Sequence, residues 1–242
     1  MVTLKLYKLF FLVCEKKMFR TENIAILVGG GPVPTFPYLR EDYPIIAVDS
    51  GLDTCISNSI LPDYFIGDMD SVSSNAKQYA KRNKIPTKQI FEQDTTDFEK
   101  ALVNIDARGY VCVGFLDGRL DHTLASLHVI QKYPQKRPIL MCGLEDAVLT
   151  GTKDFFISLP IGERISIWPL GSVRFKHSSG LLYPLTDLKM KQGSYIGTSN
   201  SVSEKAVQIC ISEGKNGTYL LILPIFYFDE LLALIGFSSV PK

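Results

Sequence analysis

The chain has 242 residues, 46% of them hydrophobic and 21% charged, which is the balance of a folded globular protein with one large domain or two modest ones. Its formal net charge of +1 shows no basic excess that would indicate nucleic-acid binding and no acidic excess that would indicate a disordered tail. The five cysteines are widely spaced, without a CxxC pair. This pattern predicts reduced thiols in the cytoplasm and argues against a disulfide framework and against a zinc site.

The N-terminus carries a short apolar run, Leu9–Cys14, flanked by lysines. The run is far shorter than the roughly 20 residues that cross a bilayer. No small-residue cleavage site of a signal peptide follows it. We therefore predict an N-terminal arm over residues 1–20 and no association with a membrane.

Residues 21–146 contain short apolar runs that are typical of buried parallel strands, most of them ending at glycine or aspartate. These runs are Ile24–Val28, Ile45–Val48, Tyr64–Ile66, Val111–Phe115 and Ile139–Cys142. Helical patterns lie between them. Strands that alternate with helices indicate an α/β domain with a parallel sheet.

Two of these helical patterns are clear in the sequence. The first has the i, i+3, i+4, i+7 spacing of one apolar helix face, at Phe98, Ala101, Leu102 and Ile105. Thr95 or Thr96 is expected to cap its N-terminus. The second helix is expected to begin near Asp121, with Leu124, Leu127 and Ile130 on its apolar side.

Residues 147–242 are rich in short β segments separated by turn residues. The predicted strands are Asp154–Ser158, Arg164–Pro169, Val173–Lys176, Ser194–Gly197, Ala206–Ile211 and Thr218–Pro224. This pattern predicts an all-β domain, either a sandwich or a barrel. The apolar tail from Ile225 is expected to pack as a final strand or helix, because Asp229 and Glu230 interrupt it.

Acidic residues follow the predicted parallel strands, at the edge of the sheet where ligands of open α/β sheets bind. They are Asp49, Asp68, Asp70 and Asp117, with Asp121 shortly beyond. In the segment Gly67–Ser71, two carboxylates two residues apart face the same way and favour Mg²⁺. An acidic turn with a helix N-cap explains the same segment without a metal.

Three further segments suggest phosphate chemistry, and each also has a simpler explanation. Asp94 and Asp97 can converge across a helix start, or serve as acids that the helix dipole favours. Arg119 stands between two acids and can clamp a phosphate or form a surface ion pair. The Gly29–Gly31 turn can bring backbone N–H groups to a phosphate, although neither GxxxxGK[ST] nor GxGxxG is present.

In their order and spacing, these segments resemble the thiamine pyrophosphokinase family. The family signatures Asp-Gly-Gly, D-x-x-I-G-D-[FM]-D-S, D-x-T-D-x-E-K-A-L and G-R-x-D-H resemble, in turn, residues 49–51, 63–71, 94–102 and 118–122. Its G-L-x-W and S-T-S-N segments resemble Gly180-Leu181 and Thr198-Ser199-Asn200. The resemblance covers roughly residues 24–223.

The resemblance implies an enzyme that transfers the pyrophosphoryl group of ATP to the hydroxyl of thiamine, giving thiamine diphosphate and AMP. It implies an α/β ATP- and Mg²⁺-binding domain over residues 21–146 and a β-sandwich thiamine-binding domain over residues 147–242. It also implies a homodimer with active sites at the subunit interface. The alternatives are a pyrophosphokinase or phosphotransferase for another small alcohol, and a non-catalytic nucleotide- or thiamine-binding sensor.

The resemblance also assigns roles to individual residues. The implied Mg²⁺ ligands are Asp68, Asp70 and Asp97. The implied ATP contacts are Gly30, Gly31, Asp49, Asp94, Thr96 and Arg119. The implied catalytic residues are Asp97, Arg119 and Asp121, and the implied thiamine contacts are Tyr183, Thr198, Ser199 and Asn200.

The sequence departs from the family pattern at three places. Ser50 replaces a glycine and narrows the space beside Asp49. Asp117 replaces the glycine before Gly118 and adds an acid. Tyr183 stands where the family often has tryptophan; a tyrosine ring can still stack on a substrate ring.

Overall fold

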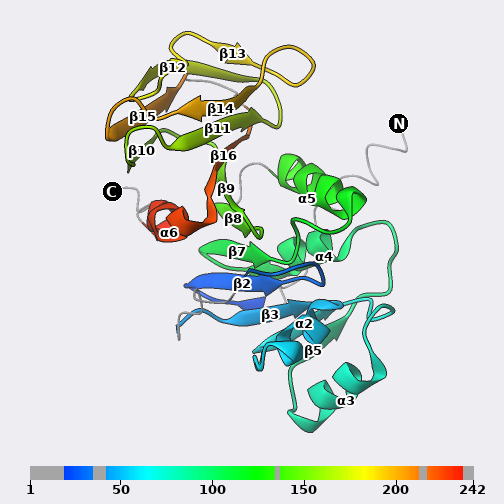
Figure 1. The fold of residues 1–242 in the computed structure, drawn as a ribbon. Helices are drawn as coiled ribbons and strands as arrows, with labels where there is room; N and C mark the ends of the chain where they lie inside the picture. Colours follow the sequence, from blue (N-terminus) through cyan, green and yellow to red (C-terminus); the bar gives the residue numbers. More distant parts are fainter. Residues whose placement is uncertain (1–18, 35–41, 134–136, 213–216, 237–242) are drawn as a thin grey trace, which may run out of the picture.

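The computed structural model describes residues 19–34, 42–133, 137–212 and 217–236, so nearly all of the predicted N-terminal arm lies outside the described residues. The chain first alternates strands and helices and then continues mostly as strands (Figure 1). The first part contains β1 (Phe19–Arg20), β2 (Ile24–Val28), β3 (Ile45–Val48), α2 (Gly51–Ser57), β4 (Tyr64–Gly67), α3 (Ser74–Arg82), β5 (Thr87–Gln89), α4 (Asp97–Asn104), β6 (Ile105–Asp106), β7 (Gly109–Val113), α5 (Leu120–Lys132) and β8 (Ile139–Cys142).

The second part begins with an antiparallel partner of β8 and ends in a helix. Its elements are β9 (Asp146–Gly151), β10 (Phe155–Ser158), β11 (Arg164–Pro169), β12 (Val173–Ser179), β13 (Lys189–Met190), β14 (Gly197–Ser201), β15 (Ala206–Ile211), β16 (Tyr219–Pro224), the 3₁₀ helix η1 (Ile225–Tyr227) and α6 (Phe228–Gly236). The predicted mixed α/β class is confirmed.

One ten-stranded sheet runs through both parts, in the order β14-β11-β16-β9-β8-β7-β2-β3-β4-β5. The strands from β8 to β5 pair in parallel, and those from β9 to β14 pair antiparallel. From β2 the chain extends to one side through β3, β4 and β5, and then crosses to the other side for β7 and β8. The order therefore reverses between β2 and β7, the kind of switch point where α/β sheets bind ligands.

The alternation of side chains along β2 divides the core into two layers. Ile24, Ile26 and Val28 belong to a core shared with α2, α3 and α6, whereas Ala25 and Leu27 belong to a core shared with α4 and α5. Successive strand residues point to opposite faces. Because helices cover both faces, β2 is apolar at every position, as is usual in parallel sheets.

A four-stranded antiparallel sheet, β10-β15-β12-β13, lies against the far end of the large sheet (Figure 1). Phe175 of β12 and Ile209 of β15 share a core with Ile165 of β11 and Leu221 of β16. Burial of these apolar side chains holds the two sheets together. The expected boundary at residues 146 and 147 falls at the start of β9, and the large sheet continues across it.

The predicted strands at residues 24–28, 45–48, 139–142, 164–169 and 206–211 have the observed bounds. The predicted strand Ser194–Gly197 is wrong in position, because β14 begins at Gly197 and contains the whole Thr198–Asn200 segment. The predicted apolar face of α5 is also partly wrong. Leu124 is 57% exposed, while Ser126, Val129 and Ile130 are buried. The apolar tail forms α6, as expected of a packed strand or helix.

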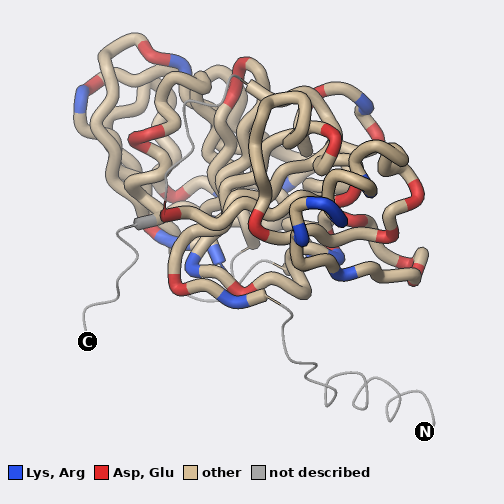
Figure 2. The backbone as a smooth tube through the Cα atoms, turned by 90° about the horizontal axis from the view of Figure 1, so that it is seen from below, with Lys and Arg blue, Asp and Glu red and all other residues tan. Residues whose placement is uncertain are grey.

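Asp and Glu residues are interspersed with Lys and Arg over the described chain (Figure 2). No helix among the described residues is long and apolar enough to cross a membrane.

Candidate active site

Three carboxylates converge beyond the carboxyl ends of β3 and β4. Asp49, Asp68 and Asp97 each place one oxygen so that the three oxygens lie within 4.8 Å of one another. Asp49 is 5% exposed, and the other two are partly buried. Three anionic oxygens this close repel one another strongly unless a cation lies among them. Their donor set suits Mg²⁺, which prefers oxygen ligands from carboxylates.

Gly67 makes this convergence possible. A Cβ atom at Gly67 would lie 2.9 Å from the Cβ of Asp49, so any larger residue would push β4 away from the end of β3. Asp49 has a φ of 47°, in the left-handed region that aspartate tolerates better than most residues. Its Oδ1 accepts a hydrogen bond of 3.0 Å from the backbone N–H of Met69. The loops after β3 and β4 are therefore joined directly.

Asp97 enters the cluster through the N-terminus of α4. Thr96 is the N-cap, and its hydroxyl accepts a hydrogen bond of 3.2 Å from the backbone N–H of Glu99, which selects between the two threonines that the sequence allowed. Asp97 Oδ1 lies 3.4 Å from the backbone N of Asp68. The acid-rich first turn of α4 thus supplies a carboxylate to the cluster as well as a favourable interaction with the helix dipole.

Lys100, which has no role in the sequence-based site, lies inside the cluster. Its Nζ is 3.0 Å from Asp68 Oδ2 and 3.1 Å from Asp97 Oδ1, and the residue is 3% exposed. Its position three residues after Asp97 on a helix was the available signal, because residues three apart lie on the same helix face. The sequence pattern indicates the aspartates as site residues but does not indicate the lysine that lies between them.

The surroundings shift the pKa values of the cluster in different directions. Burial, with the negative charge of Asp97 as the next cause, raises the pKa of Asp49 to about 6. Burial by itself would also raise the pKa of Asp68, but the hydrogen bonds from Lys100 and from the Asp70 N–H outweigh it and lower that pKa. The pKa of Lys100 is raised despite burial, because Asp68 and Asp97 both accept hydrogen bonds from it.

Two predicted residues lie outside the three-carboxylate group. Asp70 is exposed; its backbone N–H donates to Asp68 Oδ1 at 3.2 Å, and its Oδ1 accepts from Ser71 at 2.9 Å. Asp94 is exposed, and its backbone N–H donates to Glu92 at 2.9 Å. Asp49 takes the third place in the group, where the sequence suggested Asp70 as a ligand.

The Gly29–Gly31 turn is packed between two neighbouring loops at the switch point. A Cβ atom at Gly31 would lie 2.8 Å from the carbonyl oxygen of Gly114, and one at Gly30 would lie 2.0 Å from the hydroxyl oxygen of Ser50. The N–H of Gly31 donates to the Gly114 carbonyl at 3.0 Å. The turn therefore needs glycine for close packing, and the Ser50 hydroxyl lies against Gly30, whereas the sequence predicted that Ser50 narrows the space beside Asp49.

Arg119 and Asp121 pair with each other at the start of α5. Arg119 Nε donates to Asp121 Oδ1 at 3.1 Å, and Nη2 donates to Oδ2 at 2.6 Å. Both side chains are well exposed, at 70% and 65%. These hydrogen bonds from Arg119 lower the pKa of the Asp121 carboxyl below its usual range. The residue predicted to clamp phosphate is thus paired with the predicted catalytic acid in this structure.

Asp117 connects the loop after β7 to the turn between β8 and β9. Its Oδ2 accepts a hydrogen bond of 2.6 Å from the backbone N–H of Leu144. This acid, which replaces a glycine of the family pattern, therefore has a local structural partner.

The predicted thiamine contacts lie together in the β-rich part. Thr198 and Ser199 are exposed on β14, and the N–H of Ser199 donates to the Ser166 hydroxyl at 3.0 Å. Asn200 is buried and hydrogen-bonds both backbone polar groups of Tyr183. Tyr183 itself is 62% exposed. The structure thus brings Tyr183 beside the Thr198–Asn200 segment, from which it is distant in sequence.

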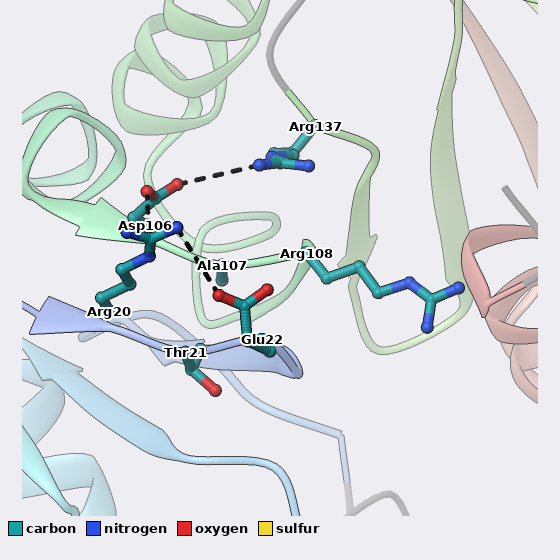
Figure 3. Close-up of a pocket in the computed structure, with 7 residues that line it drawn as sticks. All are labelled: Arg20, Thr21, Glu22, Asp106, Ala107, Arg108 and Arg137. Carbon is teal, nitrogen blue, oxygen red and sulfur yellow. Dashed lines mark ion pairs between the residues drawn. The ribbon is translucent and has the colours of Figure 1, made fainter. Parts of the chain in front are cut away.

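A separate cavity of about 280 Å³ lies at the opposite, amino edge of the parallel strands (Figure 3). It is lined by residues that precede β2, β7 and β8, together with Asp106. Asp106 faces Arg20 at 3.9 Å and Arg137 at 4.0 Å. Asp106 and these two arginines are thus paired within the cavity, and the length of the sheet separates the cavity from the carboxylate cluster.

Comparisons with known proteins cover both parts of the chain. Residues 37–142 match the family described as "Thiamin pyrophosphokinase, catalytic domain", and residues 157–215 match "Thiamin pyrophosphokinase, vitamin B1 binding domain". Thiamine pyrophosphokinase 1 of Arabidopsis thaliana is 30% identical over 171 residues, covering 64% of this chain and 63% of its own. Thiamine pyrophosphokinase 3 of Oryza sativa subsp. japonica is 29% identical over 213 residues, covering 81% of this chain and 77% of its own.

Solved structures show the same fold. The thiamin pyrophosphokinase of Geobacillus thermodenitrificans is 26% identical with a TM-score of 0.70, covering 83% of this chain and 97% of its own. The yeast thiamin pyrophosphokinase, at 17% identity, has a TM-score of 0.68 and covers 92% of this chain and 91% of its own. The two family matches together span more than half of the chain, and the chain therefore belongs to the thiamin pyrophosphokinase family.

Proposed function

We propose that this protein transfers the pyrophosphoryl group of ATP to the hydroxyl of thiamine, giving thiamine diphosphate and AMP. Family membership supports this activity. The observation that carries it is the convergence of Asp49, Asp68 and Asp97 within 4.8 Å at the carboxyl edge of the parallel sheet. Transfer of a phosphoryl group from a phosphate oxygen to an alcohol oxygen requires mostly positioning and neutralisation of charge, and this carboxylate group is suited to hold the required cation.

In the proposed reaction the thiamine hydroxyl attacks the β-phosphorus of ATP, the bond to the α-phosphate bridging oxygen breaks, and AMP leaves. Asp68, Asp70 and Asp97 would hold Mg²⁺, with Asp49 beside them. The cation would neutralise negative charge on the phosphate oxygens. The hydroxyl proton would pass to a carboxylate, either Asp97 or Asp121.

Residues from several loops at this edge of the sheet would contact ATP. Arg119 would exchange its bond to Asp121 for the ATP phosphates, where a guanidinium stabilises negative charge. The backbone of Gly30 and Gly31, together with Asp49, Asp94 and Thr96, would line the ATP site. Since the N–H of Gly31 already donates to Gly114, Gly30 has the more available donor.

We further propose two domains, a nucleotide-binding domain over residues 21–146 and a β-sandwich thiamine-binding domain over residues 147–242. Thiamine would lie against Tyr183, Thr198, Ser199 and Asn200. The exposed aromatic side chain of Tyr183 can stack on a substrate ring.

A homodimer would complete each site at the subunit interface. Exposed apolar side chains of the β-rich part support an interface there, since burial of exposed apolar surface is favourable. They are Leu182, Tyr183, Tyr195 and Ile196. A cytoplasmic location is proposed because Cys55, Cys112, Cys142 and Cys210 are free thiols.

The direct test is the purified protein with thiamine, ATP and Mg²⁺, assayed for thiamine diphosphate and AMP. Production of both in equal amounts, abolished by EDTA, is the expected result. A panel of other small alcohols, including a pterin alcohol, separates this activity from that of a related pyrophosphokinase. Formation of ADP in place of AMP, or preference for another alcohol, would contradict the proposal.

Asp70→Asn tests the proposed metal ligand that lies outside the three-carboxylate group, with Asp53→Asn as a control on a neighbouring acid. The Asp53 carboxylate accepts hydrogen bonds from Ser73 and is absent from the carboxylate group. We expect Asp70→Asn to raise the Mg²⁺ concentration needed for half-maximal AMP release. Unchanged release at all Mg²⁺ concentrations would remove Asp70 from the metal site.

A further inference from the structure

Lys100 is the only cation in contact with the carboxylate cluster among the described residues, and its position there needs explanation. It comes from the first turns of α4, and its ammonium group bridges the loop after β4 to the helix N-terminus, at 3.0 Å from Asp68 and 3.1 Å from Asp97. A buried lysine is costly unless its charge is paired and hydrogen-bonded. Here two carboxylates meet that requirement.

The hydrogen bonds fix particular oxygens. The Lys100 ammonium donates hydrogen bonds to Asp68 Oδ2 and Asp97 Oδ1, while Asp68 Oδ1 accepts one from the Asp70 N–H at 3.2 Å. Gln93 adds a weaker contact to Asp68 Oδ2 at 3.3 Å. Asp68 Oδ2 accepts from both Lys100 and Gln93, and Asp97 Oδ1 accepts from both Lys100 and the Asp68 N–H. Since a carboxylate has two oxygens with two lone pairs each, the other oxygen of each carboxylate can still face a cation. Lys100 therefore restricts the rotation of both carboxylates without excluding them from metal binding.

Lys100 also changes the net charge of the carboxylate cluster. With Asp49 ionised, the three carboxylates carry three negative charges, and Lys100 compensates one of them. A divalent cation bound among the three oxygens, which lie within 4.8 Å of one another, would also be repelled by the Lys100 ammonium. That ammonium is in direct contact with Asp68 and Asp97. Like charges at such separations in a buried site repel strongly. Lys100 thus opposes the binding of a free cation while it orients the ligands.

We infer that Lys100 is a positioning residue of the metal site, which aligns Asp68 and Asp97 and weakens the binding of Mg²⁺ that is not accompanied by a triphosphate. The polyphosphate would supply the negative charge that Lys100 compensates, so the cation and the nucleotide bind together. This inference rests on the proposed function, because it assumes that the carboxylates hold the cation of ATP.

The test is the binding of Mn²⁺, a spectroscopic substitute for Mg²⁺, measured by electron paramagnetic resonance without nucleotide or thiamine. Lys100→Met keeps the length of the side chain and removes its charge. We expect it to bind free Mn²⁺ about tenfold more tightly than the wild type. A non-hydrolysable ATP analogue should then improve Mn²⁺ binding much less in this variant than in the wild type, because the two ligands become less strongly coupled.

Lys132→Met is the matched control. Lys132, at the end of α5, forms an ion pair of 2.5 Å with Glu99 of α4, but Glu99 is not one of the converging carboxylates. Its removal should leave Mn²⁺ affinity within twofold of the wild type. Lys100→Arg retains the charge and should not tighten Mn²⁺ binding. If Lys100→Met fails to fold by circular dichroism, Lys100→Gln takes its place with the same expectation.

Weaker or unchanged Mn²⁺ binding in Lys100→Met and Lys100→Gln would overturn the inference, as would the absence of any Mn²⁺ binding in every variant. We also expect the turnover of Lys100→Met at saturating metal to fall more than tenfold, since the ligand oxygens lose their alignment. Because the Mn²⁺ measurement needs no substrate, a failure of the proposed activity appears separately, as a wild type that binds Mn²⁺ and produces no thiamine diphosphate.

Discussion

The side-chain amide of Asn200 holds the backbone of Tyr183 on both sides. Asn200 Oδ1 accepts from the Tyr183 N–H at 3.0 Å, and Nδ2 donates to the Tyr183 carbonyl at 2.7 Å. A buried asparagine with these partners is a structural connector between β14 and the loop at residues 181–184. It orients the backbone that carries the exposed ring of Tyr183, so it would affect a substrate through Tyr183 as well as through the proposed direct contact.

Asn200→Asp should therefore impair thiamine binding through Tyr183. The substitution replaces the donor to the Tyr183 carbonyl with a carboxylate oxygen, and a lost buried hydrogen bond costs about 1–3 kcal/mol. We expect a higher KM for thiamine, an unchanged KM for ATP, and a lower free energy of unfolding, measured by steady-state kinetics and urea denaturation. Gln192→Ala removes another side-chain bond to the backbone, to Pro169 at 3.0 Å, and serves as the control. An equal rise of both KM values would contradict this role.

Asp121→Asn should have opposite effects on ATP affinity and on kcat. An amide pairs less well with the Arg119 guanidinium than a carboxylate does, so Arg119 becomes more available for phosphate. We expect a non-hydrolysable ATP analogue to bind a fewfold more tightly by calorimetry, while kcat falls. Weaker binding of the analogue would show that Asp121 helps to orient Arg119 instead of competing for it.

Asp49→Asn should stabilise the metal-free protein above pH 6. The folded protein retains the Asp49 proton up to a pKa of about 6, compared with 3.8 for the ordinary carboxyl. Ionisation of the wild type above that range therefore costs folded-state stability, by about 1–3 kcal/mol. Asparagine keeps the hydrogen bond from Met69 and avoids the charge.

The sign of this effect fixes its pH dependence. The stability difference between Asp49→Asn and the wild type should be small near pH 4, grow as the pH rises through 6, and then stay constant. Urea denaturation in EDTA from pH 4.5 to 8 measures it. Added Mg²⁺ should reduce the difference at pH 8, because a cation stabilises the ionised carboxylate. A difference that does not vary with pH would contradict the cause given for the shift.

Asp117→Ala and Asp117→Gly should differ in stability. Both remove the bond to the Leu144 N–H, but Asp117 has a φ of 64°, which glycine adopts without strain and alanine does not. We expect losses of about 1–3 kcal/mol for alanine and a smaller loss for glycine, by thermal denaturation. The kcat should be unchanged in both. A large loss of kcat in the glycine variant would instead place Asp117 near the phosphates.

The sequence determined the parallel strands and their carboxyl-end acids, because apolar runs flanked by glycine and aspartate are local signals. The Thr-Ser-Asn segment was recognised, yet its strand was placed three residues too early, since a polar β14 has little apolar alternation to detect. Leu124 followed the expected helix period, but it stays exposed because the buried side of α5 is set by where that helix meets α4.

Contacts between segments distant in sequence were decided only by the tertiary structure. The pairing of β8 with β9, which joins both parts in one sheet, depends on a turn whose geometry no periodicity reveals. The sequence assigns Lys100 no role in the site, whereas three-dimensional proximity makes it the counter-charge of Asp68 and Asp97. The sequence by itself thus determined which residues are acidic and at which strand ends they lie. Only folding decided which of them meet and which cation lies between them, because carboxylate repulsion and lysine burial are properties of the assembled site.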